Sequence, residues 1–119
     1  MDLGLKDKVI IVTGGSKGIG GGIVSLLAEE GALPVIVGRN KPNIKKVIDD
    51  YHKIGFNVGY AFAELTYPEQ CKEAVASVLT KYGRIDGLVN NAGVNDSVGL
   101  EDGNHEDFQG NASLFVNSI

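Results

Sequence analysis

Short aliphatic runs and helical stripes alternate along the whole chain. Four runs, bounded by Gly, Pro or Asn, predict strands that are buried or half-buried: Lys8–Thr13, Pro34–Val37, Phe56–Ala63 and Gly87–Asn90. After each run, apolar residues recur every three or four positions, which predicts a helix with one buried face. These stripes cover Ile19–Leu27, Ile44–Tyr51, Cys71–Tyr82 and Phe108–Ile119.

Local signals indicate where these elements begin and end. Gly31 and Gly55 should end the first two helices, and Thr66-x-x-Glu69 predicts a capping box before the third. Pro34 is expected at the first position of its strand, where a missing N–H matters least. Gly21-Gly22 lies inside the first predicted helix. Each glycine there costs roughly 0.8–1 kcal/mol relative to Ala, so we expect close helix–sheet packing or a ligand to compensate.

A glycine-rich turn joins the first strand to the first helix. Residues 13–20 read TGGSKGIG, with the spacing G-x-x-x-G-x-G, which is not that of a Walker P-loop. Glycine lets a ligand approach the backbone, and the N–H groups that open a helix favour a pyrophosphate. A turn that binds nothing is the alternative. We expect a dinucleotide site formed by Gly14, Ser16, Lys17, Gly18, Ile19 and Gly20.

The order of elements predicts an α/β fold. A strand followed by a helix, repeated four times, favours a parallel sheet with right-handed crossovers. Together with the glycine turn, this order predicts a Rossmann-type sheet with strand order 3-2-1-4, the N-terminal portion of a doubly wound fold. Residues 1–119 are expected to form a single domain.

Composition narrows the class of protein. The 119 residues include 17 Gly but only three Pro, which favours specific tight turns over disorder. A net charge of −4 argues against a nucleic-acid partner. One Cys, acidic residues near the start and short apolar runs predict a cytoplasmic protein with no membrane partner. His52 and His105 have no second ligand at metal spacing, so no metal site is expected.

TGGSKGIG at residues 13–20 and NNAG at residues 90–93 each stand at the end of a predicted strand. Together these two motifs resemble the short-chain dehydrogenase/reductase family. The resemblance implies an oxidoreductase that transfers a hydride between a nicotinamide dinucleotide and a small-molecule alcohol or carbonyl. It also implies that Asn90, Ala92 and Gly93 pass beside the adenosine ribose. A buried amide that satisfies the strand ends is an equal interpretation of Asn90.

The resemblance extends to two further features. Glu64-Leu65 stands where the family has Asp followed by an aliphatic residue, with the Asp bonded to the adenine amino group. The segments MDLGLKDKV and GLVNNAGVND look most like L-fucose dehydrogenase-type sugar dehydrogenases, which implies a sugar substrate.

The end of the second strand bears on the choice of nicotinamide cofactor. An NAD enzyme of this type places an acid there for the ribose 2′-hydroxyl, whereas this chain has Gly38-Arg39-Asn40. No carboxylate occurs between Glu30 and Asp49, so nothing near this strand end should repel a 2′-phosphate. Arg39 offers a guanidinium fork for that phosphate, and Lys17 a second cation. NADP is favoured; NAD, or two merely solvated cations, are the alternatives.

The catalytic pair of the family is missing. It consists of a Tyr and a Lys four residues later, and none of the four Tyr in this chain is followed by Lys at that spacing. Asn117, in Ser113-Leu114-x-x-Asn117, is the one catalytic residue that the resemblance implies, and an exposed helix-end Asn is the alternative. We therefore expect a chain that stops before the Tyr/Lys segment, binds cofactor and is inactive alone. A non-catalytic dinucleotide-binding or assembly module is the other hypothesis.

An exposed apolar edge is expected beside the fourth strand, where further strands would pair. Such an edge favours self-association, so a homo-oligomer is predicted.

Replacing Gly18 by Val tests the role of the turn. A β-branched side chain should obstruct both the turn and the approach of a pyrophosphate, so binding of NADPH should fall below detection. Calorimetric titration measures the binding and circular dichroism the folding. A folded Gly18→Val chain with unchanged affinity would show that the turn serves structure alone.

Overall fold

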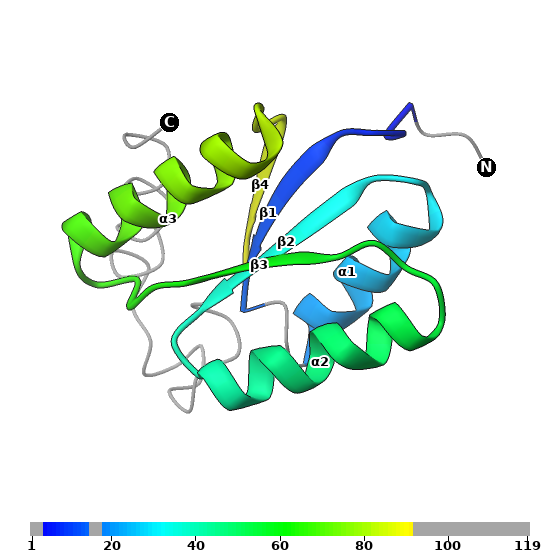
Figure 1. Cartoon of the computed structure of the whole chain (residues 1–119), viewed down its shortest axis with the longest axis horizontal. Helices are drawn as coiled ribbons and strands as arrows, with labels where there is room; N and C mark the ends of the chain where they lie inside the picture. The colour runs from blue at the N-terminus through cyan, green and yellow to red at the C-terminus, as the bar shows by residue number, and fades with distance from the viewer. Residues whose placement is uncertain (1–3, 15–17, 92–119) are drawn as a thin grey trace, which may run out of the picture.

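The computed structural model describes residues 4–14 and 18–91 of the chain (Figure 1). Its elements are β1 (Val9–Thr13), α1 (Gly18–Glu29), β2 (Leu33–Gly38), α2 (Lys41–Lys53), β3 (Gly59–Phe62), α3 (Pro68–Tyr82) and β4 (Gly87–Asn90). The strands form one parallel sheet in the order β3-β2-β1-β4. The predicted α/β fold and strand order are thus confirmed, while the predicted helix over Phe108–Ile119 lies outside the described residues.

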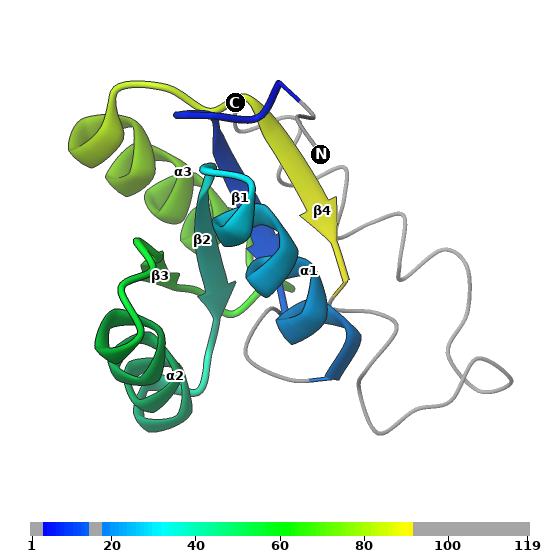
Figure 2. The same cartoon turned by 90° about the vertical axis from the view of Figure 1, so that its right-hand side faces the viewer.

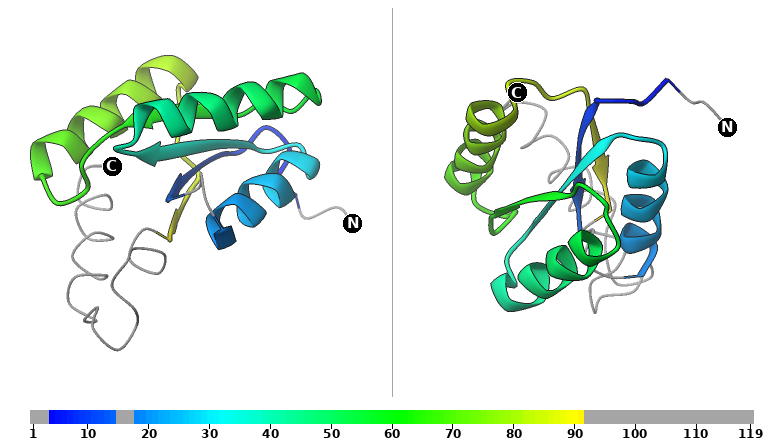
Figure 3. Two further views of the ribbon diagram at one scale, coloured as in Figure 1. Left: turned by 90° about the horizontal axis from the view of Figure 1, so that it is seen from below. Right: turned by 45° about the vertical axis from the view of Figure 1, so that its right-hand side comes forward.

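Alternate residues of the strands build a core on each face of the sheet. In β1, Val9 and Ile11 pack toward α3, whereas Ile10 and Val12 pack toward α1 and α2. The same alternation continues in the neighbouring strands, because successive side chains of a strand point to opposite faces. Figure 3 (right) shows α3 on one side of the strands and α1 on the other. Strands covered on both faces explain the continuous aliphatic runs in the sequence.

The ends of α1 and α2 follow the predicted signals. Gly31 and Gly55 come just after these helices and have φ values of 84° and 86°. The side chain of Asn40 caps α2 by accepting a hydrogen bond from the Asn43 N–H at 3.1 Å. In the described part of the chain, no helix is both long and apolar enough to cross a membrane.

The predicted capping box of α3 is wrong. Tyr67 is the N-cap residue and makes no side-chain cap hydrogen bond, while Pro68 opens the helix. A Pro disfavours helical backbone at the residue before it, and Tyr67 is extended with φ −104° and ψ 114°, so the helix starts one residue later than the capping box requires. The Thr66 hydroxyl lies 3.5 Å from the Glu64 carboxylate instead.

Several predicted boundaries and contacts also shift. β2 begins at Leu33, so Pro34 is its second residue; β3 is shorter than the predicted run and covers only Gly59–Phe62. Successive N–H groups of a strand point to opposite neighbours, and the N–H that Pro34 lacks would point toward β3. The pairing of β2 with β3 starts only at Val35 and Gly59, so the sheet loses no hydrogen bond at Pro34. Leu26 and Leu79, placed in the buried stripes by the sequence, are 52% and 38% exposed.

Asp86 ties the start of β4 to the start of β1. The Val9 N–H donates to the Asp86 carboxylate at 2.8 Å, and the Asp86 N–H donates to the Val9 carbonyl at 2.8 Å. The Arg84 guanidinium adds two bonds of 2.8 and 2.7 Å to the same carboxylate. These bonds, that of Arg84 first and that of the Val9 N–H next, lower the pKa of Asp86.

Stability should therefore depend on the ionisation of Asp86. Because the pKa of Asp86 is lowered in the folded chain, its contribution is present above the usual pKa and is lost as the pH falls below about 4. In Asp86→Asn, the free energy of unfolding should be lower at neutral pH and should fall less steeply in acid. Urea denaturation across the pH range measures this, with Asp49→Asn on the exposed face of α2 as the charge-matched control. An identical acid slope in Asp86→Asn and the unmodified chain would contradict the assignment.

Candidate cofactor-binding site

The carboxyl ends of the strands lie level at one edge of the sheet. Thr13, the last residue of β1, pairs with Val37 of β2 on one side and with Asn90 of β4 on the other. β1 ends at this edge with Thr13, and α1, which begins at Gly18, packs beside the strands (Figure 2). A ligand bound to an open parallel sheet lies beyond this edge, so the register alone brings three predicted binding segments together.

A buried hydroxyl joins the ends of β1 and β4. Thr13 is fully buried, and its Oγ1 donates to Asn90 Oδ1 at 2.8 Å, with the Val89 carbonyl at 3.4 Å. The same oxygen accepts the Asn91 N–H at 2.9 Å. The side chain of Asn90 thus has the structural role that the sequence left open. Sequence analysis missed Thr13 and Asn91; the signal was a pair of polar residues at the ends of two adjacent buried strands.

Gly20 allows α1 to approach the turn at very short range. A Cβ on Gly20 would overlap the Gly14 carbonyl oxygen and would lie 2.6 Å from Asn91 Nδ2. Gly14 itself has a φ of 69°, which a side chain would strain, and its N–H donates to the Val37 carbonyl at 3.2 Å. The first turn of the helix is therefore held directly against the ends of β1 and β4.

In the part of the chain that the structure describes, the Asn91 side chain holds a buried donor without a partner. The residue is 5% exposed, and among the described residues its Nδ2 has no hydrogen-bond partner. A buried amide without a partner costs about 1–3 kcal/mol. An orphaned donor beside a glycine cradle at the carboxyl edge fits a ligand with acceptor oxygens, as a dinucleotide has.

Only some of the remaining predicted residues of the turn and loop belong to the part of the chain that the structure describes. Gly18 opens α1 and Ile19 follows it. Ser16, Lys17, Ala92, Gly93 and Asn117 lie outside the described residues, so their proposed roles stay predictions.

Arg39 and Glu64, predicted to have separate roles, form an ion pair. Arg39 follows β2, Glu64 comes two residues after β3, and Arg39 Nη1 donates to Glu64 Oε2 at 3.1 Å. The prediction that no carboxylate lies near the end of β2 is therefore wrong. It counted acids along the sequence, whereas the parallel pairing of β2 and β3 brings one from 25 residues away.

Leu65 and Cys71 complete this corner of the sheet. Leu65 packs against the core beneath α3, and its carbonyl accepts the Cys71 thiol at 3.5 Å. Burial raises the pKa of the Cys71 thiol.

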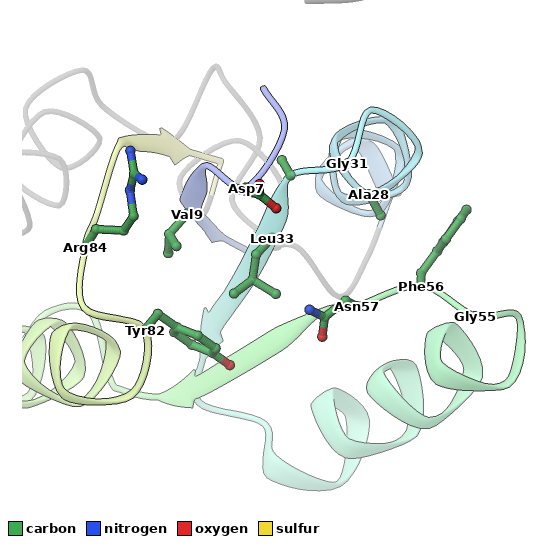
Figure 4. A pocket seen from close by; sticks show the side chains of 11 residues that line it. Asp7, Val9, Ala28, Gly31, Leu33, Gly55, Phe56, Asn57, Tyr82 and Arg84 are labelled. Atoms are coloured by element: carbon green, nitrogen blue, oxygen red, sulfur yellow. The ribbon is translucent and has the colours of Figure 1, made fainter. Parts of the chain in front are cut away.

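A hollow of about 380 Å³ lies at the other edge of the sheet. Its lining includes Val9 and Leu33, the first residues of β1 and β2, together with Asp7, Tyr82 and Arg84 (Figure 4). It is therefore separate from the glycine turn.

The arrangement agrees with the comparison to known families. The model of a family described as short chain dehydrogenase matches residues 8–119. The chain belongs to this family. Its short chain dehydrogenase relatives include a 3-oxoacyl-[acyl-carrier-protein] reductase of Chlamydia pneumoniae, which is 38% identical over 119 residues, all of this chain. An 11-beta-hydroxysteroid dehydrogenase-like protein of Arabidopsis thaliana is 34% identical over 96 residues, covering 80% of this chain and 32% of the relative.

A solved short chain dehydrogenase structure has the same fold. L-sorbose reductase from Gluconobacter frateurii, in complex with NADPH and L-sorbose, superposes with a TM-score of 0.81 at 30% sequence identity. The match covers 100% of this chain and 48% of that one. The chain likewise spans 48% of the length of the Chlamydia pneumoniae reductase.

Gly20 and Gly22, both in α1, provide a matched test of the close contact between Gly20 and Gly14. Gly20→Ala should lower the free energy of unfolding by about 1–3 kcal/mol, because backbone must move to admit the methyl group. Among the described residues, nothing lies within 4 Å of a Cβ added at Gly22, so close helix–sheet packing, one of the two compensations expected there, is not found. Gly22→Ala should raise the free energy of unfolding by up to about 1 kcal/mol through helix propensity.

Urea denaturation measures both variants, and titration with NADPH should show weaker binding for Gly20→Ala alone. Equal stability of the two variants would contradict the packing described for Gly20.

Proposed function

We propose that this chain is the cofactor-binding part of an NADP(H)-dependent oxidoreductase that interconverts an alcohol and a carbonyl. The observation that carries the proposal is the cradle at the carboxyl edge. There, Gly20 lies so close to the Gly14 carbonyl that no side chain would fit between them. The side-chain amide of Asn91, next to Gly20, has no partner among the described residues. Membership in the short chain dehydrogenase family supports a nicotinamide dinucleotide as the ligand.

Each end of the sheet edge has a proposed task in holding the cofactor. The turn of Gly14, Ser16, Lys17, Gly18, Ile19 and Gly20 would hold the pyrophosphate, because N–H groups at the start of α1 attract negative charge. Asn90, Ala92 and Gly93 would pass beside the adenosine ribose. When bound, the nicotinamide supplies or accepts the hydride.

The adenosine end would lie beyond β2 and β3. Glu64 and Leu65 would flank the adenine, and Arg39 would face the ribose 2′-position. Arg39 is 77% exposed in its side chain, so a phosphate can reach the guanidinium without displacing core residues. NADP is the favoured cofactor for this reason, with NAD as the alternative.

We further propose a small-molecule substrate, with a sugar as the leading candidate. L-sorbose reductase, a structural relative with an NADPH complex, supports this choice. Asn117 is the proposed catalytic residue within the chain, and a cytoplasmic homo-oligomer is the proposed form. No Tyr-x-x-x-Lys occurs in the 119 residues, so the proposed task of this chain is binding.

Cofactor titrations test the proposal. The unmodified chain should bind NADPH about tenfold more tightly than NADH, because a phosphate–guanidinium contact is charge-assisted. Arg39→Ala should narrow this ratio toward one. Isothermal titration calorimetry measures both affinities, and Lys72→Ala, an exposed cation of α3, is the control that should leave the ratio unchanged.

Equal affinity of the unmodified chain for NADPH and NADH would refute the NADP preference. Failure to bind either dinucleotide would refute the proposed function.

A further inference from the structure

The contact between Arg39 and Glu64 follows from the way in which β2 and β3 end. Gly38 pairs with Phe62 in the sheet, and the Ala63 N–H donates to the Gly38 carbonyl at 2.8 Å. The two segments that follow β2 and β3 therefore leave the sheet side by side. Their next charged residues meet at 3.1 Å, between Arg39 Nη1 and Glu64 Oε2.

Glu64 is the anchored partner of the pair. Its N–H donates to Gln70 Oε1 of α3 at 2.6 Å, and the Thr66 hydroxyl lies 3.5 Å from its Oε1. Its side chain is 28% exposed, whereas that of Arg39 is 77% exposed. The backbone of Glu64 is thus bonded to α3 and its side chain is the more buried of the two, whereas the Arg39 side chain extends along the surface to reach it.

This contact competes with an incoming phosphate. A guanidinium binds an anion best through two parallel N–H groups, and the carboxylate already takes one terminal nitrogen. A 2′-phosphate at Arg39 would share the fork with Glu64 or displace it. In both cases a second negative charge lies close to the phosphate and opposes it. A ribose 2′-hydroxyl meets no such opposition.

We propose that Glu64 is a specificity-determining residue that weakens the preference for NADP over NAD by acting through Arg39. The inference rests on the proposed function. Glu64 does not contact the reacting atoms in this assignment; it positions the guanidinium and partly neutralises it. The selectivity of the site is then set by a balance between one cation and one neighbouring anion.

Glu64→Gln tests this balance. It keeps the length of the side chain and the backbone bond to Gln70, and removes only the charge. The ratio of the dissociation constants for NADH and NADPH should rise about two- to fivefold, the range expected for losing an exposed ion pair. The rise should shrink at high salt, since the groups are exposed.

Two further variants separate this role from others. Glu69→Gln removes the same charge from an exposed residue of α3, 83% exposed in its side chain, and should leave the ratio unchanged. In the Arg39→Ala background, Glu64→Gln should raise the ratio less, because the guanidinium for which the carboxylate and the phosphate compete is gone and only the direct repulsion between them is removed. Calorimetric titration of the full 119-residue chain gives all the constants, and circular dichroism checks folding.

The outcomes are distinguishable. An unchanged or lower ratio in Glu64→Gln, or a rise of equal size without Arg39, would overturn the inference while leaving dinucleotide binding intact. An unmodified chain that binds neither NADPH nor NADH would instead overturn the proposed function on which the inference rests.

Discussion

The Thr13 hydroxyl bonds the last residues of β1 and β4 to each other inside the protein. It donates to Asn90 and accepts from the backbone of Asn91, and it is fully shielded from water. One buried group therefore fixes the ends of these two strands relative to each other. Losing it would remove one bond to the Asn90 side chain and one to the Asn91 N–H, each of which contributes about 0.5–1.5 kcal/mol.

The two edges of the sheet differ in how their polar groups are bonded. At the amino edge, Asp86 and Arg84 hold the start of β4 against β1 with bonds of 2.7–2.8 Å. At the carboxyl edge, backbone groups crowd around Gly14 and Gly20, and the Asn91 amide is left without a described partner. Polar groups are satisfied where the fold needs stability and left available where a ligand is proposed. A short chain dehydrogenase would place its dinucleotide at the second edge.

The ion pair at the ends of β2 and β3 shows how small energies can set selectivity. An exposed pair such as Arg39–Glu64 contributes on the order of 1 kcal/mol or less. That is a small part of the free energy of unfolding, but about 1 kcal/mol changes a binding ratio about fivefold. Substitutions at the outer end of a strand can therefore alter cofactor choice without disturbing the two cores, whose residues lie on the faces of the sheet.

The sequence by itself determined the order of elements, the parallel sheet and the location of the glycine turn. Those features depend on local periodicity and on residues such as Gly31 and Gly55, whose backbone conformations follow from their own chemistry. It did not determine the start of α3, where Pro68 overrode the capping pattern, or the exposure of Leu26. Only the tertiary structure decided that Glu64 meets Arg39 and that Asn91 lies against Gly20. These contacts join residues 25 and 71 positions apart, and their partners are selected by strand register, which no local pattern encodes.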